Sequence, residues 1–176
     1  FAARVLALGK PTVAVLLNGG AVGCDALAAA APALVEAFYP SAYGAEALAD
    51  VLFGAVAPSG RMPYTTPRAA FVDEVDFLDY NMSSDGGKTY KYVDPASPLF
   101  PFGWGLSYTN FSLALDAASA APRALATADA RAELALNVSV QNVGPVAGAE
   151  VLLLYAAPRT VAPRTAGTPV VRKQLV

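Results

Sequence analysis

The chain has no histidine and only one cysteine, and these two absences exclude several kinds of chemistry. Without histidine, its 176 residues cannot form a Ser-His-Asp or Cys-His catalytic set or a histidine-based metal site. A single cysteine, Cys24, excludes a disulfide within the chain and a cysteine-rich zinc site. We expect Cys24 to pack as a small apolar residue rather than to act as a reactive thiol.

Long apolar runs and basic clusters are missing as well. No uninterrupted apolar stretch reaches the roughly 18 residues of a membrane-spanning helix, so the sequence predicts no membrane partner. The formal net charge is −2 and the lysines and arginines are scattered, which argues against nucleic acid because phosphate binding needs a basic patch. Asn18-Gly-Gly20 lacks the spacing of a dinucleotide fingerprint, and we predict neither a cofactor nor a metal.

Aromatic residues are concentrated in one stretch, Pro98–Phe111, which holds five of them. Its prolines resist the α region and its glycines allow turns, so we expect an irregular segment whose rings bury apolar area against a neighbouring surface. It separates a mixed α/β sequence from a purely β sequence, and we interpret it as the joint between two domains. Trp104 either packs in this joint or stacks on a sugar, and we favour packing.

The sequence before the joint, residues 1–97, alternates between helical and strand patterns, which is typical of a doubly wound α/β sheet. The chain is predicted to start, without an initiator methionine, on the end of a helix, Phe1–Leu8, which Gly9 stops. Two predicted strands buried on both faces follow, Thr12–Leu17 and Ala33–Tyr39, with the helix Ala26–Ala31 between them and Asp25 as its cap. The last predicted element is the helix Ala45–Phe53, which Gly54 stops. Because ligands bind beyond the carboxyl ends of such strands, Asn18–Gly23 and Tyr39–Gly44 are the expected ligand-facing loops.

The region between this alternation and the joint carries most of the clustered acidic residues. We expect Arg61–Thr66 to be extended and Thr89–Val93 to be a short strand. Asp73, Glu74, Asp76 and Asp79 could suggest a glycosidase carboxylate pair or a calcium site. Since Phe71, Val75 and Phe77 alternate with them, we favour an extended segment with its acidic side in solvent.

The sequence after the joint, residues 112–176, predicts a truncated antiparallel β-sandwich. Ser112–Ala118 is predicted as a strand and the alanine-rich 117–130 as a loop. Glu133–Gln141 alternates with Leu134, Leu136, Val138 and Val140 on one face, and Ala149–Tyr155 follows as its meander partner. A sandwich needs about seven strands, so this domain is expected to be incomplete. Three sequons, at Asn81, Asn110 and Asn137, are typical of a secreted glycoprotein.

Several segments, in order and in register, resemble glycoside hydrolase family 3. Pro101-Phe-Gly-Trp-Gly-Leu-Ser-Tyr-Thr109 is similar to the family's Pro-Phe-Gly-x-Gly-Leu-Ser-Tyr-Thr joint, and Pro58–Pro63 is similar to its Pro-x-Gly-Arg-Leu-Pro segment. The other matching segments are Lys10–Gly20, Phe38–Pro40 and Ala45–Gly54, and Val138–Tyr155 resembles the start of a fibronectin type III-like domain. Ser41–Ala45 departs from the family's Gly-Gln-x-Gly-Gly, and we expect the bulkier Tyr43 to alter that loop.

The resemblance implies a secreted retaining β-glycosidase that acts on oligosaccharides, with its nucleophile on an N-terminal barrel and its acid/base ahead of the strand that Lys10–Leu17 matches. No residue of this chain is therefore assigned a catalytic role. Asn18, Gly19, Gly20, Tyr39 and Tyr43 are the candidate cleft-wall residues. Phe71–Met82 with Gly87–Tyr92 resembles the β-xylosidase branch; the alternatives are a β-glucosidase, a non-catalytic carbohydrate-binding module of the same fold, and an α/β domain of unrelated function.

Overall fold

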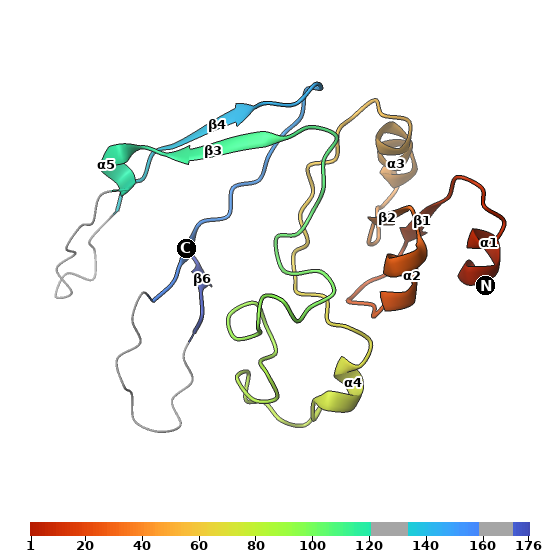
Figure 1. Cartoon of the computed structure of the whole chain (residues 1–176), viewed down its shortest axis with the longest axis horizontal. Coiled ribbons are helices and arrows are strands. Elements are labelled where there is room, and N and C mark those ends of the chain that lie inside the picture. The colour runs from red at the N-terminus through yellow and green to blue at the C-terminus, as the bar shows by residue number, and fades with distance from the viewer. Residues whose placement is uncertain (121–133, 159–170) are drawn as a thin grey trace.

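The computed structural model describes residues 1–120, 134–158 and 171–176, which form short helices and three separate strand pairs (Figure 1). The helices are α1 (Ala2–Leu6), α2 (Asp25–Ala30), α3 (Gly44–Leu52), α4 (Phe71–Glu74) and α5 (Ala117–Ala120). The strands are β1 (Val13–Leu16), β2 (Ala33–Glu36), β3 (Phe111–Leu115), β4 (Val138–Asn142), β5 (Tyr155–Ala156) and β6 (Gln174–Leu175). Within these residues no helix has the length and apolar character needed to cross a bilayer.

The first part of the chain has the predicted order of helix, strand, helix, strand, helix, so the α/β alternation is confirmed. β1 and β2 pair in parallel with Val13 opposite Ala33 and Leu16 opposite Glu36, and α2 forms the crossover between them. Gly54 ends α3 with a φ of +78°, the left-handed conformation predicted for its stop. The prediction that both strands are buried on both faces is wrong for this chain, because no hydrophobic side chain among the described residues is fully buried.

Asp25 does not cap α2 as predicted. It is the first residue of the helix, and Cys24 precedes it as the N-cap without a side-chain hydrogen bond. The Asp25 carboxylate turns outward instead: Oδ2 accepts a hydrogen bond from the Ala69 N–H at 2.8 Å, and Oδ1 lies 3.3 Å from Arg68 Nη1. A partner distant in sequence has displaced the local capping arrangement.

The aromatic joint is irregular, as predicted, and its backbone pairs with the predicted extended segment 61–66. The Met62 N–H donates to Trp104 O at 2.7 Å and the Gly103 N–H donates to Met62 O at 2.8 Å. Farther along, Thr66 and Phe100 form an antiparallel bridge, and Thr66 is only 3% exposed. Trp104 itself is 46% exposed, so the prediction that it is buried is wrong in this structure.

The joint also touches both parts of the chain through side chains. Tyr108 Oη donates to Val51 O in α3 at 2.7 Å, while Phe102 stacks on Tyr90 with ring centroids 4.6 Å apart and meets Tyr155 edge-on at 6.4 Å. Next to it, Arg61 Nη2 and Glu150 Oε1 form an ion pair of 2.5 Å. The segment Pro98–Phe111 thus contacts residues on both sides of it in the sequence, and its role as an inter-domain joint stays a prediction.

The β pairing differs from the predicted meander. β4 pairs antiparallel with β3, and β5 pairs with β6, so the segments predicted at 133–141 and 149–155 are not partners. β4 begins only at Val138 and all of its residues are exposed, so the expected half-buried face is absent. Residues 149–154 form no strand, and two of their side chains lie near the joint: Glu150 pairs with Arg61, and Leu153 lies over Gly103.

Three local predictions are also wrong. Phe71–Glu74 is a helix instead of an extended segment, and Phe77, expected on the buried side, is 94% exposed. Residues 89–93 form a turn instead of a strand, in which Thr89 O accepts hydrogen bonds from the N–H groups of Tyr92 and Val93. Ala117–Ala120 is helical where a loop was expected, and the rest of the predicted 117–130 loop lies outside the described residues.

Removing the partner of Arg61 should destabilise the contact between the joint and the β part. The two side chains are only 13% and 16% exposed, so Glu150→Ala leaves a largely desolvated guanidinium without its charge partner. We expect a loss of about 3 kcal/mol in the free energy of unfolding, near the lower end of the range for breaking a buried pair. Urea unfolding checks this, with the exposed Glu46→Ala as the matched control; equal stability of the two variants would contradict it.

Candidate functional site

The carboxyl ends of β1 and β2 bring two of the predicted loops together. Asn18 lies just after β1, and Glu36 is the last residue of β2. Asn18 Nδ2 donates to Glu36 Oε2 at 3.3 Å, and the Phe38 N–H donates to Glu36 Oε1 at 3.1 Å. One carboxylate thus connects the loop after β1 to the loop after β2, at the edge where parallel sheets bind ligands.

The ring of Tyr39, in the loop after β2, lies against Gly19 in the loop after β1. A Cβ built on Gly19 would lie 2.7 Å from Tyr39 Cε2, which is closer than real side chains approach, so a larger residue here would displace the ring. Gly20, in contrast, has open space around it. Tyr39 remains 77% exposed. The structure therefore gathers Asn18, Gly19, Gly20 and Tyr39, four of the five predicted cleft-wall residues, at one edge.

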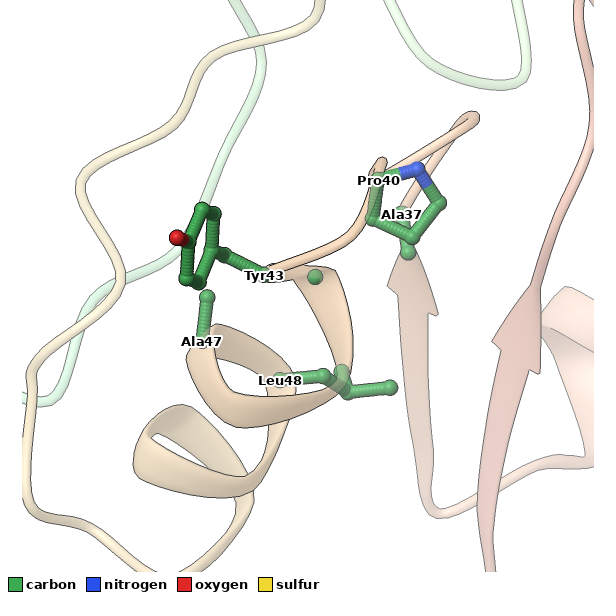
Figure 2. A pocket seen from close by; sticks show the side chains of 6 residues that line it. Ala37, Pro40, Tyr43, Ala47 and Leu48 are labelled. Carbon is green, nitrogen blue, oxygen red and sulfur yellow. The ribbon is translucent and has the colours of Figure 1, made fainter.

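Tyr43, the fifth, belongs to a different feature. An apolar hollow of about 320 Å³ lies between the end of β2 and α3. Figure 2 shows the side chains that line it, with the Tyr43 ring turned away from Pro40. The hollow is lined by Ala37, Pro40, Tyr43, Gly44, Ala47 and Leu48. Tyr43 is 82% exposed, so its bulk is accommodated by pointing outward. The tightest packing in this loop is instead between buried Gly44 and Pro40, since a Cβ added to Gly44 would lie 2.6 Å from Pro40 Cγ.

Two residues of the loop after β2 have left-handed backbones although neither is glycine. Phe38 has a φ of 52° and Ser41 a φ of 60°. This conformation is uncommon for side chains other than glycine, asparagine and aspartate, and for a bulky residue it needs surrounding contacts that impose it. At Phe38 these contacts are the hydrogen bond to Glu36 and an edge-on ring contact with Tyr64, whose centroid lies 5.8 Å away.

The titratable groups next to this loop are affected by burial and by its charges. Burial raises the pKa of the Cys24 thiol, and the negative charges of Asp25 and Glu36 raise it further, so the thiolate is disfavoured. Burial is also the main reason that the pKa of Tyr64 is raised, with Glu36 adding to it. Cys24 is half-buried and unbonded to sulfur, in line with the apolar role predicted for it.

The acidic loop is not assembled as a site. Asp73, Glu74 and Asp76 are exposed, as the solvated-face interpretation predicted. Asp79 is committed to its own loop, where it accepts hydrogen bonds from Ser84 Oγ and the Asn81 N–H; these two bonds, the first more strongly, hold the pKa of its carboxyl below the usual range. Within residues 1–120, 134–158 and 171–176, no three metal-ligating side chains gather.

The three sequon asparagines, Asn81, Asn110 and Asn137, are all exposed, and their glycosylation stays a prediction. Glu36 and Tyr64 were missed by sequence reasoning. Glu36 had a signal, because it is the only charged residue in the apolar run 33–39, at the end of a predicted parallel strand. Tyr64 had none, since only the fold brings it to Phe38.

Comparison with known proteins finds the same family by its family model and by its individual relatives. Residues 1–108 match the Glycosyl hydrolase family 3 C-terminal domain. The chain is 36% identical over 170 residues to a probable exo-1,4-beta-xylosidase of Aspergillus flavus, covering 89% of this chain and 22% of that protein. It is 35% identical over 156 residues to a periplasmic beta-glucosidase of Salmonella typhimurium, covering 85% and 20%.

A solved exo-beta-xylosidase in complex with a xylobiose aziridine probe superposes with a TM-score of 0.74 at 25% identity, covering 99% of this chain and 26% of that one. The chain thus spans about a fifth of the length of the curated relatives that it matches.

Replacing Ser41 by glycine should stabilise the loop after β2. The residue holds a φ of 60° while its carbonyl accepts the Gly44 N–H at 3.2 Å, and glycine adopts this conformation without steric cost. We expect Ser41→Gly to raise the free energy of unfolding by roughly 0.5–1 kcal/mol. Ala42→Gly, at a neighbouring exposed position without positive φ, is the matched control and should be neutral or destabilising in urea unfolding. A less stable Ser41→Gly protein would contradict this account.

Acid should weaken the link between α2 and residues 68–69. The Ala69 N–H is the main reason that the pKa of Asp25 is lowered, and the Arg68 guanidinium contributes. Since the native pKa lies below the unfolded value, this contribution is present above the unfolded pKa of about 3.9 and is lost as pH falls through the native pKa.

We expect Asp25→Asn to be less stable than the wild type at neutral pH, and the difference to shrink as pH falls below the unfolded pKa of about 3.9. Unfolding curves recorded at neutral pH and over a series of acidic pH values measure this. Exposed Asp73→Asn is the control, and a difference that is independent of pH would contradict the assignment.

Proposed function

Since this chain belongs to glycoside hydrolase family 3 and matches its C-terminal domain, we propose that it is part of a longer retaining β-glycosidase that removes terminal β-linked sugars from oligosaccharides. The observation that carries the proposal is the continuous match of residues 1–108, supported by the superposition of nearly the whole chain on a solved family 3 exo-beta-xylosidase.

The finer architecture that we propose divides the chain into three parts. Residues 1–97 belong to a doubly wound α/β domain, of which β1, β2 and their covering helices are a portion. Residues 98–111 are the joint, and residues 112–176 belong to a fibronectin type III-like β-sandwich. The parallel pairing of β1 with β2 supports the first assignment, and the antiparallel pairings β3–β4 and β5–β6 support the last.

Catalysis, in this proposal, uses carboxylates from elsewhere in the longer protein. Retaining hydrolysis needs a nucleophile and an acid/base about 5–5.5 Å apart. The resemblance places both in sequence that would precede Phe1, so we assign no catalytic role here. Asn18, Gly19, Gly20 and Tyr39 form a section of the cleft wall, because they meet at the carboxyl edge of β1 and β2.

The substrate that we favour is a β-xyloside, with a β-glucoside as the alternative. Relatives named as xylosidases and glucosidases match this chain at nearly equal identity, and the similarity of residues 71–92 to the xylosidase branch decides for the former. The non-catalytic alternative rested on the altered 41–45 loop. Tyr43 points outward and is 82% exposed, so its bulk does not fill the hollow beside it, and we favour the enzymatic proposal over this alternative.

We also propose that the protein works outside the cytoplasm. The three sequon asparagines are exposed and therefore accessible to glycosylation, and the relative from Salmonella typhimurium is named as periplasmic. No nucleic-acid or membrane partner is proposed.

Activity of the full-length protein tests this function directly. We expect it to cleave aryl β-xylosides with a higher kcat/KM than aryl β-glucosides and to retain the anomeric configuration, which NMR of the first product shows. The 176-residue chain alone should cleave neither. The reverse substrate order would reject the xylosidase branch, and no cleavage of any β-glycoside would reject the proposed function.

A further inference from the structure

We propose that Glu36 is a positioning residue of the cleft wall, which fixes Tyr39 over Gly19 so that its ring presents one face to a sugar. This proposal rests on the proposed function and adds that Glu36 affects sugar binding through Tyr39, without touching the sugar. Glu36 stands at the end of β2, and the residues that it fixes belong to the two loops beyond the strand ends.

The Glu36 carboxylate acts as a bracket because its two oxygens have different partners. Oε2 accepts from Asn18 Nδ2 and Oε1 accepts from the Phe38 N–H, at 3.3 and 3.1 Å. Asn18 is 18 positions away in the sequence and Phe38 only two. The carboxylate therefore sets the separation of the two loops and the conformation of its own loop at the same time.

The backbone conformation of Phe38 sets the position of the next residue, Tyr39. Its φ of 52° is one that a bulky side chain rarely adopts without external support. The hydrogen bond to Glu36 holds its amide, and the edge-on contact with Tyr64 holds its ring. Because the amide and the ring of Phe38 are both fixed, the backbone direction after Phe38 is fixed too, and this direction places Tyr39 beside Gly19.

Tyr39 has the chemistry to meet a sugar. Its ring lies beside Gly19, and the residue is 77% exposed, so most of the ring faces solvent. A rigid aromatic ring offers a large apolar surface at little conformational cost, which suits the C–H face of a pyranose. Glu36, in contrast, already has protein donors on both oxygens, which favours a positioning role over direct contact with substrate.

Asn18 makes a sharp test possible. Its Oδ1 atom is buried without a hydrogen-bond partner among the described residues, while its Nδ2 faces Glu36. In Glu36→Gln, the Asn18 amide can rotate so that Oδ1 accepts from the new glutamine Nε2, and the glutamine Oε1 still accepts from Phe38. Asn18→Asp instead places two carboxylates against each other. Combining both substitutions restores a donor–acceptor pair, with the charge now on residue 18.

The experiment measures kcat and KM of the full-length protein on an aryl β-xyloside, together with the dissociation constant for xylobiose by calorimetry. We expect Glu36→Ala and Asn18→Asp to raise KM and the dissociation constant about three- to tenfold with little change in kcat, from the usual net size of one lost hydrogen bond. Glu36→Gln should bind more tightly than Glu36→Ala, and the Asn18→Asp/Glu36→Gln double variant should bind more tightly than Asn18→Asp. Glu46→Ala, on the exposed side of α3, is the matched control.

A double-mutant cycle separates positioning from general stability. Tyr39→Ala should weaken binding by a similar factor, and Glu36→Ala/Tyr39→Ala should be no weaker than Tyr39→Ala alone, because Glu36 acts through that ring. Additive effects on KM, or a loss confined to kcat or Tm, would overturn the proposal. Should Glu36→Ala fail to fold, the contrast between Asn18→Asp and the double variant carries the test.

Failure of the proposed function has a separate signature. If the wild-type protein binds xylobiose without cleaving any glycoside, the enzymatic proposal fails while the binding data still decide the role of Glu36. If the wild-type protein neither binds nor cleaves, both proposals are overturned.

Discussion

The pairing between residues 61–66 and the aromatic joint is the interaction on which the other long-range contacts rest. Its backbone hydrogen bonds, from Met62 with Trp104 and Gly103 to Thr66 with Phe100, replace the regular sheet that neither segment forms. Close approach makes this possible: a Cβ on Gly105 would clash with the backbone carbonyl oxygen of Gly60, so a larger residue would separate the two backbones. Because these backbones are held together, Arg61 can reach Glu150 and Tyr108 can reach α3.

Polar side chains also link segments of this chain that are far apart in the sequence. The Asp25–Ala69 hydrogen bond, the Arg61–Glu150 ion pair and the Glu36 carboxylate each make such a link. None of the described hydrophobic side chains is fully buried, and large ones such as Phe53 and Phe77 are mostly exposed. The chain spans about a fifth of the length of its curated relatives, so these exposures describe this segment by itself.

Local patterns predicted the first part of the chain well and the β part poorly. Apolar runs and glycine stops located β1, β2 and α3, because a parallel crossover is built from neighbouring segments with strong periodicity. The pairing of β4 with β3 escaped prediction, since the pairing partner of a strand is chosen by contacts across the chain. Residues 149–154 were predicted as part of a strand, and yet Glu150 and Leu153 contact residues of the joint and its neighbour Arg61. At the candidate site, the rule for carboxyl ends found Asn18, Gly19, Gly20 and Tyr39, while Tyr43 proved to line a separate hollow.

The family, the α/β alternation and the irregular joint follow from the sequence alone, because motifs, periodicity and the backbone restrictions of proline and glycine are local properties that need no coordinates. The partners of the polar side chains, in contrast, are set only in the folded chain. The sequence predicts that Asp25 caps its own helix, but in the folded chain the Ala69 N–H lies 2.8 Å from its carboxylate and binds it instead. Glu36 links two loops because the parallel pairing of β1 and β2 places Asn18 beside it. A hydrogen bond depends on the distance between two groups, and for groups 18 or 44 residues apart that distance is set by the fold.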